Sequence, residues 1–307
     1  MDWIVGVDGG GSKTAIVAKT LGGAEERACR VASICPHDHG VEGFSRVLVE
    51  AFRIMGVPLS GIAAICLGIP CFGEYPALDE AVTARTRQLF PNAKIRCEND
   101  CFVGFAGAFG LKSGINVVAG TGAIAFGMDE KGSCARSNGW HSGFSDEGSG
   151  AWLGRQAFSL YCKQLDGRAE RSVFSDIFRE ALGLVTDTDV IAYYNAHCEN
   201  DRTGLAKAQE LLLKAARLGD AQAIDLYNAA ARELSHSVLA VYRALDLASP
   251  VRISYSGGVF RADNFLLVPF TRMVQEAIPN SLICPPLYSA EYGALLAAER
   301  LLASETM

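Results

Sequence analysis

The sequence predicts an α/β protein built from two related domains. A short apolar strand, a glycine-rich turn and a second apolar strand open the chain, and the same pattern recurs near residue 115. Helical segments separate these hairpins from further strands, which is the alternation expected of α/β domains. The chain has 307 residues, and because domains average about 150 residues, its length also fits two domains.

The elements of the first half follow from apolar patterning. Residues 3–7 form an apolar strand that ends at Asp8, and a second strand over 15–18 pairs with it across the glycine turn. Apolar side chains recur at helical spacing over 42–55. The remaining elements, two of them ended by a proline, are a strand over 61–69, a helix over 77–90, a strand over 94–97 and a helix over 101–109.

The second half begins in the same way, with a strand, a glycine turn and a strand over 115–128. From residue 151 the pattern is mostly helical, with a break near Gly219 and a late strand over 251–255. We therefore expect these domains: an N-terminal domain over 1–110, a C-terminal domain with helical insertions over 111–290, and a C-terminal helix over 291–307 that packs back on the first domain.

Composition excludes several classes of protein. With 28 Lys and Arg against 34 Asp and Glu, the net charge is −6, and an acidic chain without a basic cluster is not typical of nucleic-acid binding. No apolar run reaches the roughly 18 residues of a membrane span, and the N-terminus lacks the basic start of a signal peptide. The 10 cysteines form no C-x-x-C pair, so we expect a cytoplasmic protein with reduced thiols.

Three glycine-rich turns follow strands, at residues 9–12, 120–122 and 256–258. Glycine reaches positive φ values and lets a backbone approach a ligand closely, so such a turn can direct several N–H groups at a phosphate. A single turn of this kind is equally typical of a tight hairpin. Three of them, one directly after Asp8, indicate a nucleotide site.

Two common nucleotide motifs do not fit. A P-loop needs Gly-Lys-Ser/Thr at the start of a helix, whereas Ser12 separates Gly11 from Lys13 and a β-branched, strand-like segment follows. The dinucleotide-binding fingerprint also requires a helix after the turn. The chain is therefore neither a P-loop NTPase nor a Rossmann dehydrogenase.

The motifs instead resemble the N-acetylglucosamine kinase and BadF/BadG-type ATPase family, within the actin-like superfamily of sugar kinases, Hsp70 and actin. Residues 7–14 resemble its first phosphate motif, residues 120–123 its second and residues 256–259 its adenosine motif. The most specific block is 145–154, which reads SDEGSGAWLG. The resemblance implies two duplicated ribonuclease-H-like domains with ATP in the cleft between them.

The resemblance also implies how Mg-ATP is held. Asp8 would hold Mg²⁺, and its alternative role is to stabilise a turn. Lys13 on its own is more typical of a solvated surface lysine. The residues implied to bind ATP are Gly9, Gly10, Gly11, Ser12, Lys13, Thr14, Gly120, Thr121, Gly122, Gly257 and Gly258.

Asp100 is the candidate general base, because phosphoryl transfer to a hydroxyl needs positioning and a carboxylate that accepts the proton. On the residues alone, a helix N-cap ahead of Cys101 is the favoured role of Asp100. In the family the corresponding Asp follows an Asn, as Asp100 follows Asn99, and this favours the base.

A sugar site is implied around the second glycine turn. The residues assigned to the sugar are Asn99, Asp100, Thr121, Gly139, Trp140 and Asp146. Trp140 would stack on the sugar ring, and the Asp146 carboxylate would accept hydrogen bonds from the sugar hydroxyls. The alternatives are a partly buried core role for Trp140 and an N-cap role for Asp146.

The chain departs from the family pattern at two points. Ala123 replaces the usual Ser of the second phosphate motif, which removes one hydroxyl donor but keeps the backbone N–H groups. The loop over 33–39 (SICPHDH) lacks the Asn that contacts the sugar in related kinases, and His37 or Asp38 are the available substitutes. The second departure leaves the identity of the sugar open.

Two cysteine patterns have plainer explanations. Cys35, His37 and His39 suggest a zinc site, but no fourth ligand and no spacing motif support it. A polar loop is the simpler interpretation. Cys97 and Cys101 are four residues apart and read as small core side chains.

The favoured function is an ATP-dependent sugar kinase that phosphorylates N-acetylglucosamine or glucosamine, with ATP and Mg²⁺ as cofactors. One alternative is a BadF/BadG-type ATPase activator of a reductase or dehydratase, which needs iron–sulfur cysteines; Cys134 has no partner at the usual spacing. The other is a nucleotide or sugar sensor without turnover. We expect a small-molecule sugar as partner, and neither nucleic acid nor membrane; a homodimer stays open.

Overall fold

The computed structural model describes residues 2–303, without the side chain of Asp263. The chain forms two compact units, one of residues Met1–Ser113 with Pro285–Met307 and one of residues Gly114–Cys284. We call them the first and the second unit. Residues 304–307 of the expected C-terminal segment lie outside the described part.

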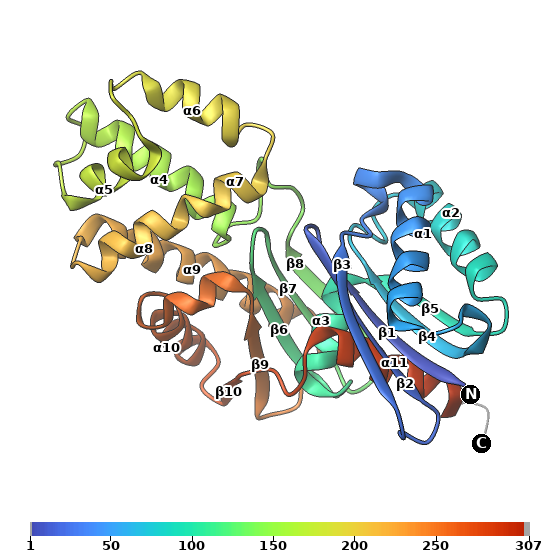
Figure 1. Cartoon of the computed structure of the whole chain (residues 1–307). Helices are drawn as coiled ribbons and strands as arrows, with labels where there is room; N and C mark the ends of the chain where they lie inside the picture. The colour runs from blue at the N-terminus through green and yellow to red at the C-terminus, as the bar shows by residue number, and fades with distance from the viewer. Residues whose placement is uncertain (1, 304–307) are drawn as a thin grey trace. The chain divides into compact units, whose positions relative to one another are not determined.

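The first unit holds a five-stranded sheet of order β3-β2-β1-β4-β5 (Figure 1). Its strands are β1 (Trp3–Gly9), β2 (Lys13–Thr20), β3 (Glu26–Ala32), β4 (Ile62–Ile69) and β5 (Lys94–Asn99). The helical segments are α1 (Pro36–Met55), η1 (Leu59–Gly61), α2 (Pro76–Leu89), α3 (Asp100–Phe109) and α11 (Ala290–Ala303). β1 is antiparallel to β2 and parallel to β4, and β4 is parallel to β5.

Alternation along β1 assigns its two faces. Trp3, Val5 and Val7 belong to one apolar core that also contains Phe44 and Leu48 of α1. Gly6 lies on the opposite face, where a β-carbon would be 2.1 Å from the carbonyl oxygen of Glu291. The backbone of α11 therefore packs directly on β1, and only glycine allows this approach.

The second unit repeats the same sheet, with the order β10-β9-β6-β7-β8. Its strands are β6 (Gly114–Ala119), β7 (Ala123–Met128), β8 (Cys134–Asn138), β9 (Val251–Ser256) and β10 (Ser281–Cys284). Read from β8, every pairing matches its counterpart in the first unit: antiparallel for β8-β7-β6, then parallel for β6-β9-β10. The predicted α/β fold with two duplicated domains is confirmed.

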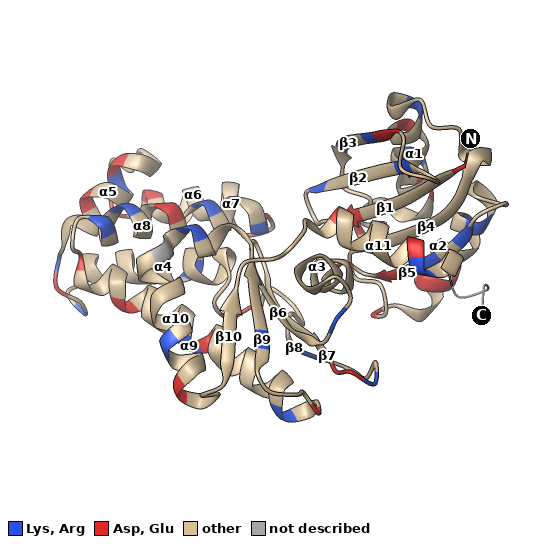
Figure 2. Cartoon of the chain, turned by 90° about the horizontal axis from the view of Figure 1, so that it is seen from below, with Lys and Arg blue, Asp and Glu red and all other residues tan. Residues whose placement is uncertain are grey.

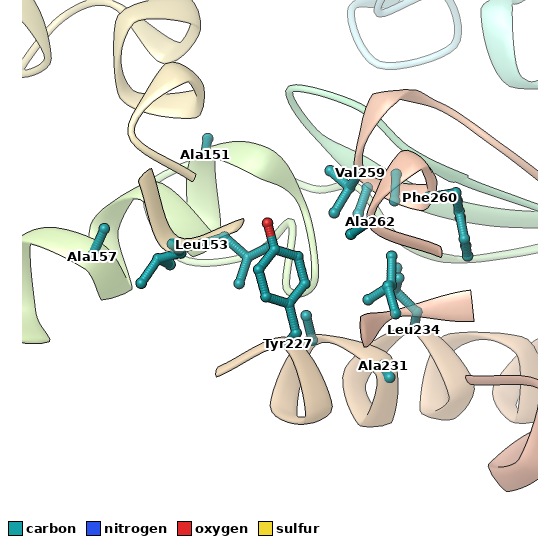
Figure 3. Packing of buried hydrophobic residues seen from close by; sticks show 14 of the residues in the cluster. Ala151, Leu153, Ala157, Tyr227, Ala231, Leu234, Val259, Phe260 and Ala262 are labelled. Atoms are coloured by element: carbon teal, nitrogen blue, oxygen red, sulfur yellow. The ribbon is translucent and has the colours of Figure 1, made fainter. Parts of the chain in front are cut away.

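Helices make up the rest of the second unit. They are α4 (Gly150–Leu165), α5 (Val173–Leu182), α6 (Asp189–His197), α7 (Arg202–Lys207), α8 (Gln209–Arg217), α9 (Ala221–Ala244), η2 (Gly258–Phe265) and α10 (Leu267–Ala277). Figure 3 shows their core, in which Tyr227 and Leu234 of α9 face Leu153 of α4 and Val259 of η2. The Tyr227 hydroxyl donates to Gln209 Oε1 at 2.7 Å. Asp220 caps α9 by accepting from the Ala223 N–H, at the helix break predicted near Gly219.

The charged side chains are interspersed over the helices of both units (Figure 2). No helix in the described part is long and apolar enough to cross a membrane. Four elements were not expected from the sequence: β3, β8, β10 and α10. Two of them, β3 and β8, are edge strands whose side chains are at best half-buried, so they lack the apolar pattern that marks an inner strand.

Candidate active site

The carboxyl ends of β1, β4 and β5 bring Asp8 and Asp100 to one edge of the first sheet. Asp8 is opposite Gly68 in the β1–β4 pairing, and Asn99 is opposite Ile69 in the β4–β5 pairing. A β-carbon at Gly68 would lie 3.3 Å from the Cα of Asp100. Parallel strands present their carboxyl ends at one edge, so this register sets the two carboxylates near each other.

Asp8 has an unusual electrostatic environment. It lies on the same face of β1 as Gly6 because side chains alternate along a strand, and α11 begins there with Glu291 in its first turn. Burial, followed by the negative charges of Asp100 and Glu291, raises the pKa of Asp8 to about 7, and the positive charges of Lys13 and Arg30 oppose the shift. The negative charges near Asp8 therefore outweigh the positive charges of Lys13 and Arg30 in their effect on its pKa.

This donor set fits a magnesium ion. Mg²⁺ prefers carboxylate oxygens, keeps several waters and takes one or two protein carboxylates. Asp8 provides one such carboxylate beside two others. Among the described residues, no three acidic, His or Cys side chains are grouped so that they could enclose a metal.

Asn99, and not Asp100, caps α3. The Asn99 side chain accepts from the Cys101 N–H at 3.1 Å. Its amide also donates to the Phe72 carbonyl at 2.9 Å, and this ties the start of α3 to the segment after β4. Asp100 is the first residue of α3 and not its cap. The N-cap alternative for Asp100 was wrong.

The first glycine turn is tightly built. A β-carbon at Gly9 would lie 2.7 Å from the Gly68 carbonyl oxygen, and the Gly10 N–H donates to the Lys13 carbonyl at 2.8 Å. The three residues at its tip are exposed: Gly11, Ser12 and Lys13. The turn thus presents backbone N–H groups, a hydroxyl and an ammonium group to solvent.

Thr14 requires a correction. It is 0% exposed, and its hydroxyl oxygen accepts from the Ile34 N–H at 3.1 Å. Ser33 reinforces the same contact by donating to the Gly10 carbonyl at 2.8 Å. The structure therefore gives Thr14 a role in fixing the loop over 33–35 to the glycine turn, and does not support the phosphate contact expected of its side chain.

In the second unit, two glycine turns lie at neighbouring strand ends. β6 and β9 are parallel, with Val118 opposite Ser256, so the turn after each strand lies at the same edge. A β-carbon at Gly257 would be 2.3 Å from the Ala119 carbonyl oxygen and 2.9 Å from the Gly120 nitrogen. The sequence separates these turns by more than 130 residues, and the sheet brings them together.

At these turns, glycine is needed more because neighbouring atoms lie close to its Cα than because the residue adopts a positive φ. Gly257 has a φ of 102°, whereas φ lies outside the left-handed region at Gly9, Gly10, Gly120, Gly122 and Gly258. Of the two properties expected of glycine, positive φ is used at Gly257. Gly9 and Gly257 leave no space for a side chain, while Gly120 and Gly258 would tolerate a β-carbon.

Asp146 braces the second glycine turn from inside. It is 5% exposed, and its Oδ1 accepts from the Ala123 N–H at 3.2 Å. A β-carbon at Gly122 would lie 3.0 Å from the Asp146 Oδ2. Burial raises the pKa of Asp146, while the bond from Ala123 and the charges of two arginines lower it.

Ser149, rather than Asp146, caps α4, by accepting from the Trp152 N–H at 3.1 Å. The N-cap alternative for Asp146 was therefore wrong. The Gly150 N–H and the Ala151 N–H donate to the carbonyls of Gly120 and Thr121. The glycine turn is thus held both by the Asp146 carboxylate and by the start of α4.

Trp140 lies in the loop between β8 and α4 and is 66% exposed. The guanidinium of Arg136 lies over its ring at 4.4 Å from the centroid. The core role considered for Trp140 was therefore wrong. The preceding Gly139 has a φ of 71°, and a β-carbon there would contact Ile124 at 3.0 Å.

Asn138 organises this loop, and sequence reasoning missed it. Its Oδ1 accepts from the Ser145 hydroxyl at 2.8 Å and from the Asp146 N–H at 2.9 Å. Its amide donates to the Glu147 carbonyl at 3.0 Å. The available signal was an Asn directly before Gly139. Glu291 was missed as well, since its only sequence signal is its place at the start of the last helix.

The loop over 33–39 carries Cys35, His37 and His39, the side chains that suggested a zinc site. Within the described residues, no three acidic, His or Cys side chains converge on a metal position. His37 is exposed, and its Nδ1 lies 3.2 Å from the Asp38 Oδ1.

The second unit has a separate cavity of about 270 Å³ among helices α4 to α8, lined by Phe158, Tyr193, His197, Lys207 and Leu211 among others. No residue predicted for the site lines it.

A family model described as the BadF/BadG/BcrA/BcrD ATPase family matches residues 5–298. The chain belongs to this family. The resemblance inferred from the glycine turns and the SDEGSG block is confirmed, and it extends over both units.

Curated relatives of this BadF/BadG/BcrA/BcrD family member are sugar kinases. The N-acetylmuramic acid/N-acetylglucosamine kinase of Clostridium acetobutylicum is 29% identical over 309 residues, covering 97% of this chain and 98% of that protein. The N-acetyl-D-glucosamine kinase of Dictyostelium discoideum is 25% identical over 312 residues, covering 96% and 97%.

Solved structures give the same result for the fold. A candidate N-acetylglucosamine kinase from Chromobacterium violaceum has a TM-score of 0.78 to this family member at 25% identity, covering 96% of this chain and 98% of that one. A glucokinase of the ROK family from Streptomyces griseus has a TM-score of 0.60 at 16% identity, with coverage of 97% and 98%, and supports the fold alone.

Proposed function

We propose that the protein catalyses ATP-dependent phosphorylation of a hydroxyl on an N-acetylated hexosamine. The observation that carries the proposal is the placement of Asp8 and Asp100 at one sheet edge, beside a glycine turn with an exposed Ser12 and Lys13. A metal-holding carboxylate, phosphate donors and a proton acceptor are the groups that phosphoryl transfer requires.

The phosphates of ATP would be held mainly by backbone N–H groups. In the first unit the donors are the turn over 9–12 and the Lys13 ammonium. In the second unit they are the turn over 120–122, while Gly257 and Gly258 form the adenosine-side turn. Asp8 holds Mg²⁺, which supplies charge neutralisation on the phosphates when bound. Ala123 offers no hydroxyl, so its backbone N–H, already bonded to Asp146, adds rigidity rather than a donor.

Asp100 would accept the proton of the attacking hydroxyl. Its position at the N-terminus of α3 favours the ionised form, because the helix dipole stabilises negative charge there. Asn99 fixes that terminus through two hydrogen bonds, and its remaining amide hydrogen can reach a substrate hydroxyl. The neighbouring Asp8 charge would be offset by the cation, so Asp100 can stay ionised when Mg-ATP is bound.

Trp140, Gly139 and Thr121 would contact the sugar. Trp140 presents an exposed ring that can stack on the apolar face of a pyranose, and Arg136 orients the ring. Asp146 contributes by bracing Gly122 and Ala123, and any direct contact with the sugar must come from its Oδ2. Because one curated relative accepts both N-acetylmuramic acid and N-acetylglucosamine, both belong among the first substrates to test. We infer a cytoplasmic location, where ATP is present and the thiols stay reduced.

The test is ADP release from Mg-ATP with a panel of sugars and a control without sugar. The panel comprises N-acetylglucosamine, N-acetylmuramic acid, glucosamine, N-acetylmannosamine and glucose, with phosphorylated products identified by mass spectrometry. Release that depends on an N-acetylated hexosamine supports the proposal and names the acceptor. Steady release that ignores every sugar contradicts it and favours the ATPase activator.

A further inference from the structure

Two thiols meet beside the candidate active site. Cys35 directly precedes α1, and Cys71 lies in the turn that follows β4. The two side chains lie close enough for each thiol to shift the pKa of the other as a hydrogen-bond partner. They are 36 positions apart in the sequence, so the contact exists only because the fold brings the start of α1 against the β4–α2 segment.

A second contact holds the same two segments together. The rings of His37 and Tyr75 lie 5.1 Å apart with an interplanar angle of 31°. Cys71 itself has a φ of 62°, a left-handed conformation that is rare for residues other than glycine and is kept only where the surroundings impose it. The surroundings of Cys71 therefore fix its backbone conformation.

The thiol pair has an asymmetric chemistry. The hydrogen bond from Cys71 and the backbone N–H of Asp38 together lower the pKa of Cys35 to about 7, against the opposing effect of burial. The same hydrogen bond, followed by burial, raises the pKa of Cys71. Cys35 is therefore the more acidic thiol of the pair, and the thiolate is the form that reacts with oxidants.

The pair connects the two sides of the first unit's site. On one side, the Cys35 N–H donates to the Ser33 hydroxyl at 3.1 Å, and Ser33 in turn binds the Gly10 carbonyl of the glycine turn. On the other side, Phe72 follows Cys71 and its carbonyl holds Asn99, the cap of α3. A change in the separation of Cys35 and Cys71 would reach both the phosphate turn and the helix that positions Asp100.

We propose that Cys35 and Cys71 are a redox-sensitive pair that peroxide converts to a disulfide, and that this bond stops phosphoryl transfer. The second half of the inference rests on the proposed function. A hydrogen-bonded thiol pair is wider than a bonded one, since the S–S bond is only about 2.05 Å. Closing it must pull the loop over 33–35 and the turn at Cys71 toward each other.

The chemistry balances with hydrogen peroxide as oxidant. The Cys35 thiolate attacks one peroxide oxygen, the O–O bond breaks, and a sulfenic acid and hydroxide form. The Cys71 sulfur then attacks the Cys35 sulfur, its proton and the sulfenic hydroxyl leave as water, and the S–S bond forms. In sum, two thiols and one hydrogen peroxide give one disulfide and two waters. Cys35 is 3% exposed, which favours a small oxidant over a bulky disulfide.

The experiment treats the full-length protein with hydrogen peroxide and identifies linked peptides by mass spectrometry, independently of any activity. Kinase activity is measured in parallel with the acceptor found in the sugar panel. We expect a Cys35–Cys71 linkage, a loss of at least tenfold in kcat, and recovery of both after dithiothreitol. If no sugar is phosphorylated before oxidation, the proposed function fails while the linkage can still be read.

Two variants serve as controls. Cys71→Gly suits the left-handed backbone and removes the thiol, so this variant is expected to keep its activity in peroxide; if it does not fold, Cys35→Ser is used instead. Cys134→Ser removes an exposed thiol of the second unit and should respond like the wild type. Absence of the linkage overturns the inference, and so does a linkage that leaves kcat unchanged.

Discussion

Asn99 and Asp100 divide two tasks that the sequence alone could not assign. Either side chain can cap a helix, and both precede the same apolar segment. The structure gives the cap to Asn99, whose amide is also bonded to Phe72. Asp100 therefore enters the helix as its first residue, at the sheet edge that also carries Asp8. The order of the two residues makes the amide the cap of α3 and leaves the carboxylate in its first turn.

Replacing Asp100 with Asn tests its role as base. The Asn side chain keeps the shape but accepts no proton, so kcat is expected to fall by about 10²–10⁴, the usual contribution of general base catalysis. The Kd for Mg-ATP, measured by calorimetry, should change by less than about threefold because the phosphate turns stay intact. Asp2→Asn, at an exposed carboxyl ahead of β1, is the matched control. An Asp100→Asn enzyme with wild-type kcat would contradict the assignment.

The raised pKa of Asp8 makes stability depend on pH in a defined direction. The unfolded chain has the ordinary value near 3.8 and the folded protein a value of about 7. Between these values the unfolded state releases the proton and the folded state keeps it, so ionisation favours unfolding. Without Mg²⁺, stability is expected to decrease as the pH rises from about 4 to 7.

Replacing Asp8 with Asn should remove this penalty. Urea unfolding of the metal-free protein at pH 8 is expected to show a gain of about 1–3 kcal/mol, and at pH 5 a smaller gain. Asp225→Asn, at an exposed carboxyl on α9, should show no such pH-dependent gain. Equal effects of Asp8→Asn at the two pH values would contradict the buried-carboxyl interpretation.

At the scale of elements, the loop between β8 and α4 has a rigid base and an exposed tip. Asn138 holds the base through four hydrogen bonds. Trp140 and Phe144 both project outward, at 66% and 77% exposed. In the described part of the chain, only one of these two rings has a cation over it. That ring is Trp140, and the cation is Arg136.

The two aromatic residues of this loop form a matched pair for a test. Trp140→Ala is expected to raise the KM for the sugar about tenfold, equivalent to about 1.4 kcal/mol, with the KM for ATP unchanged. Phe144→Ala removes a ring of similar exposure and should leave the sugar KM nearly as it is. Steady-state kinetics with each substrate varied separately gives both constants. Equal effects of the two variants would remove Trp140 from the sugar site.

Inner strands could be predicted from the sequence because burial on both faces leaves a continuous apolar run, and amphipathic helices because burial on one face leaves a periodic pattern. β1, β4 and β6 are of this kind. β3 and β8 could not, since they lie at sheet edges and carry charged side chains, an exposed Arg30 in β3 and a half-buried Arg136 in β8. The glycine turns were found by composition, but the buried position of Thr14 and the bracing role of Asp146 depend on contacts between segments distant in sequence, which no local pattern records.

At the scale of the molecule, the first unit is discontinuous in sequence. α11 returns to it after the whole second unit and packs on Gly6 of β1 and on α3, where a β-carbon at Gly293 would lie 2.2 Å from the Gly107 nitrogen. The second unit is continuous, and its core draws on Gly114–Cys284 alone. Completion of the first unit therefore depends on the last described helix.

A chain that ends at Cys284 should lose the first unit selectively. Hydrogen exchange is expected to show lost protection in β1 and β4, whose face against α11 becomes exposed, and kept protection in β6 and β7. Gly293→Leu is the full-length companion, because its side chain cannot fit against Gly107 and should weaken the same strands. Uniform protection of β1 in both variants would show that α11 is dispensable.

This threading has a consequence for biosynthesis. A ribosome releases residues in order, and domains fold as their residues emerge. The second unit has all its strands once Cys284 has emerged, whereas β1, made first, must wait for α11, made last. The second unit, most of which is translated later, is thus expected to fold earlier. The nascent first unit is the part that most needs chaperones to protect it during synthesis.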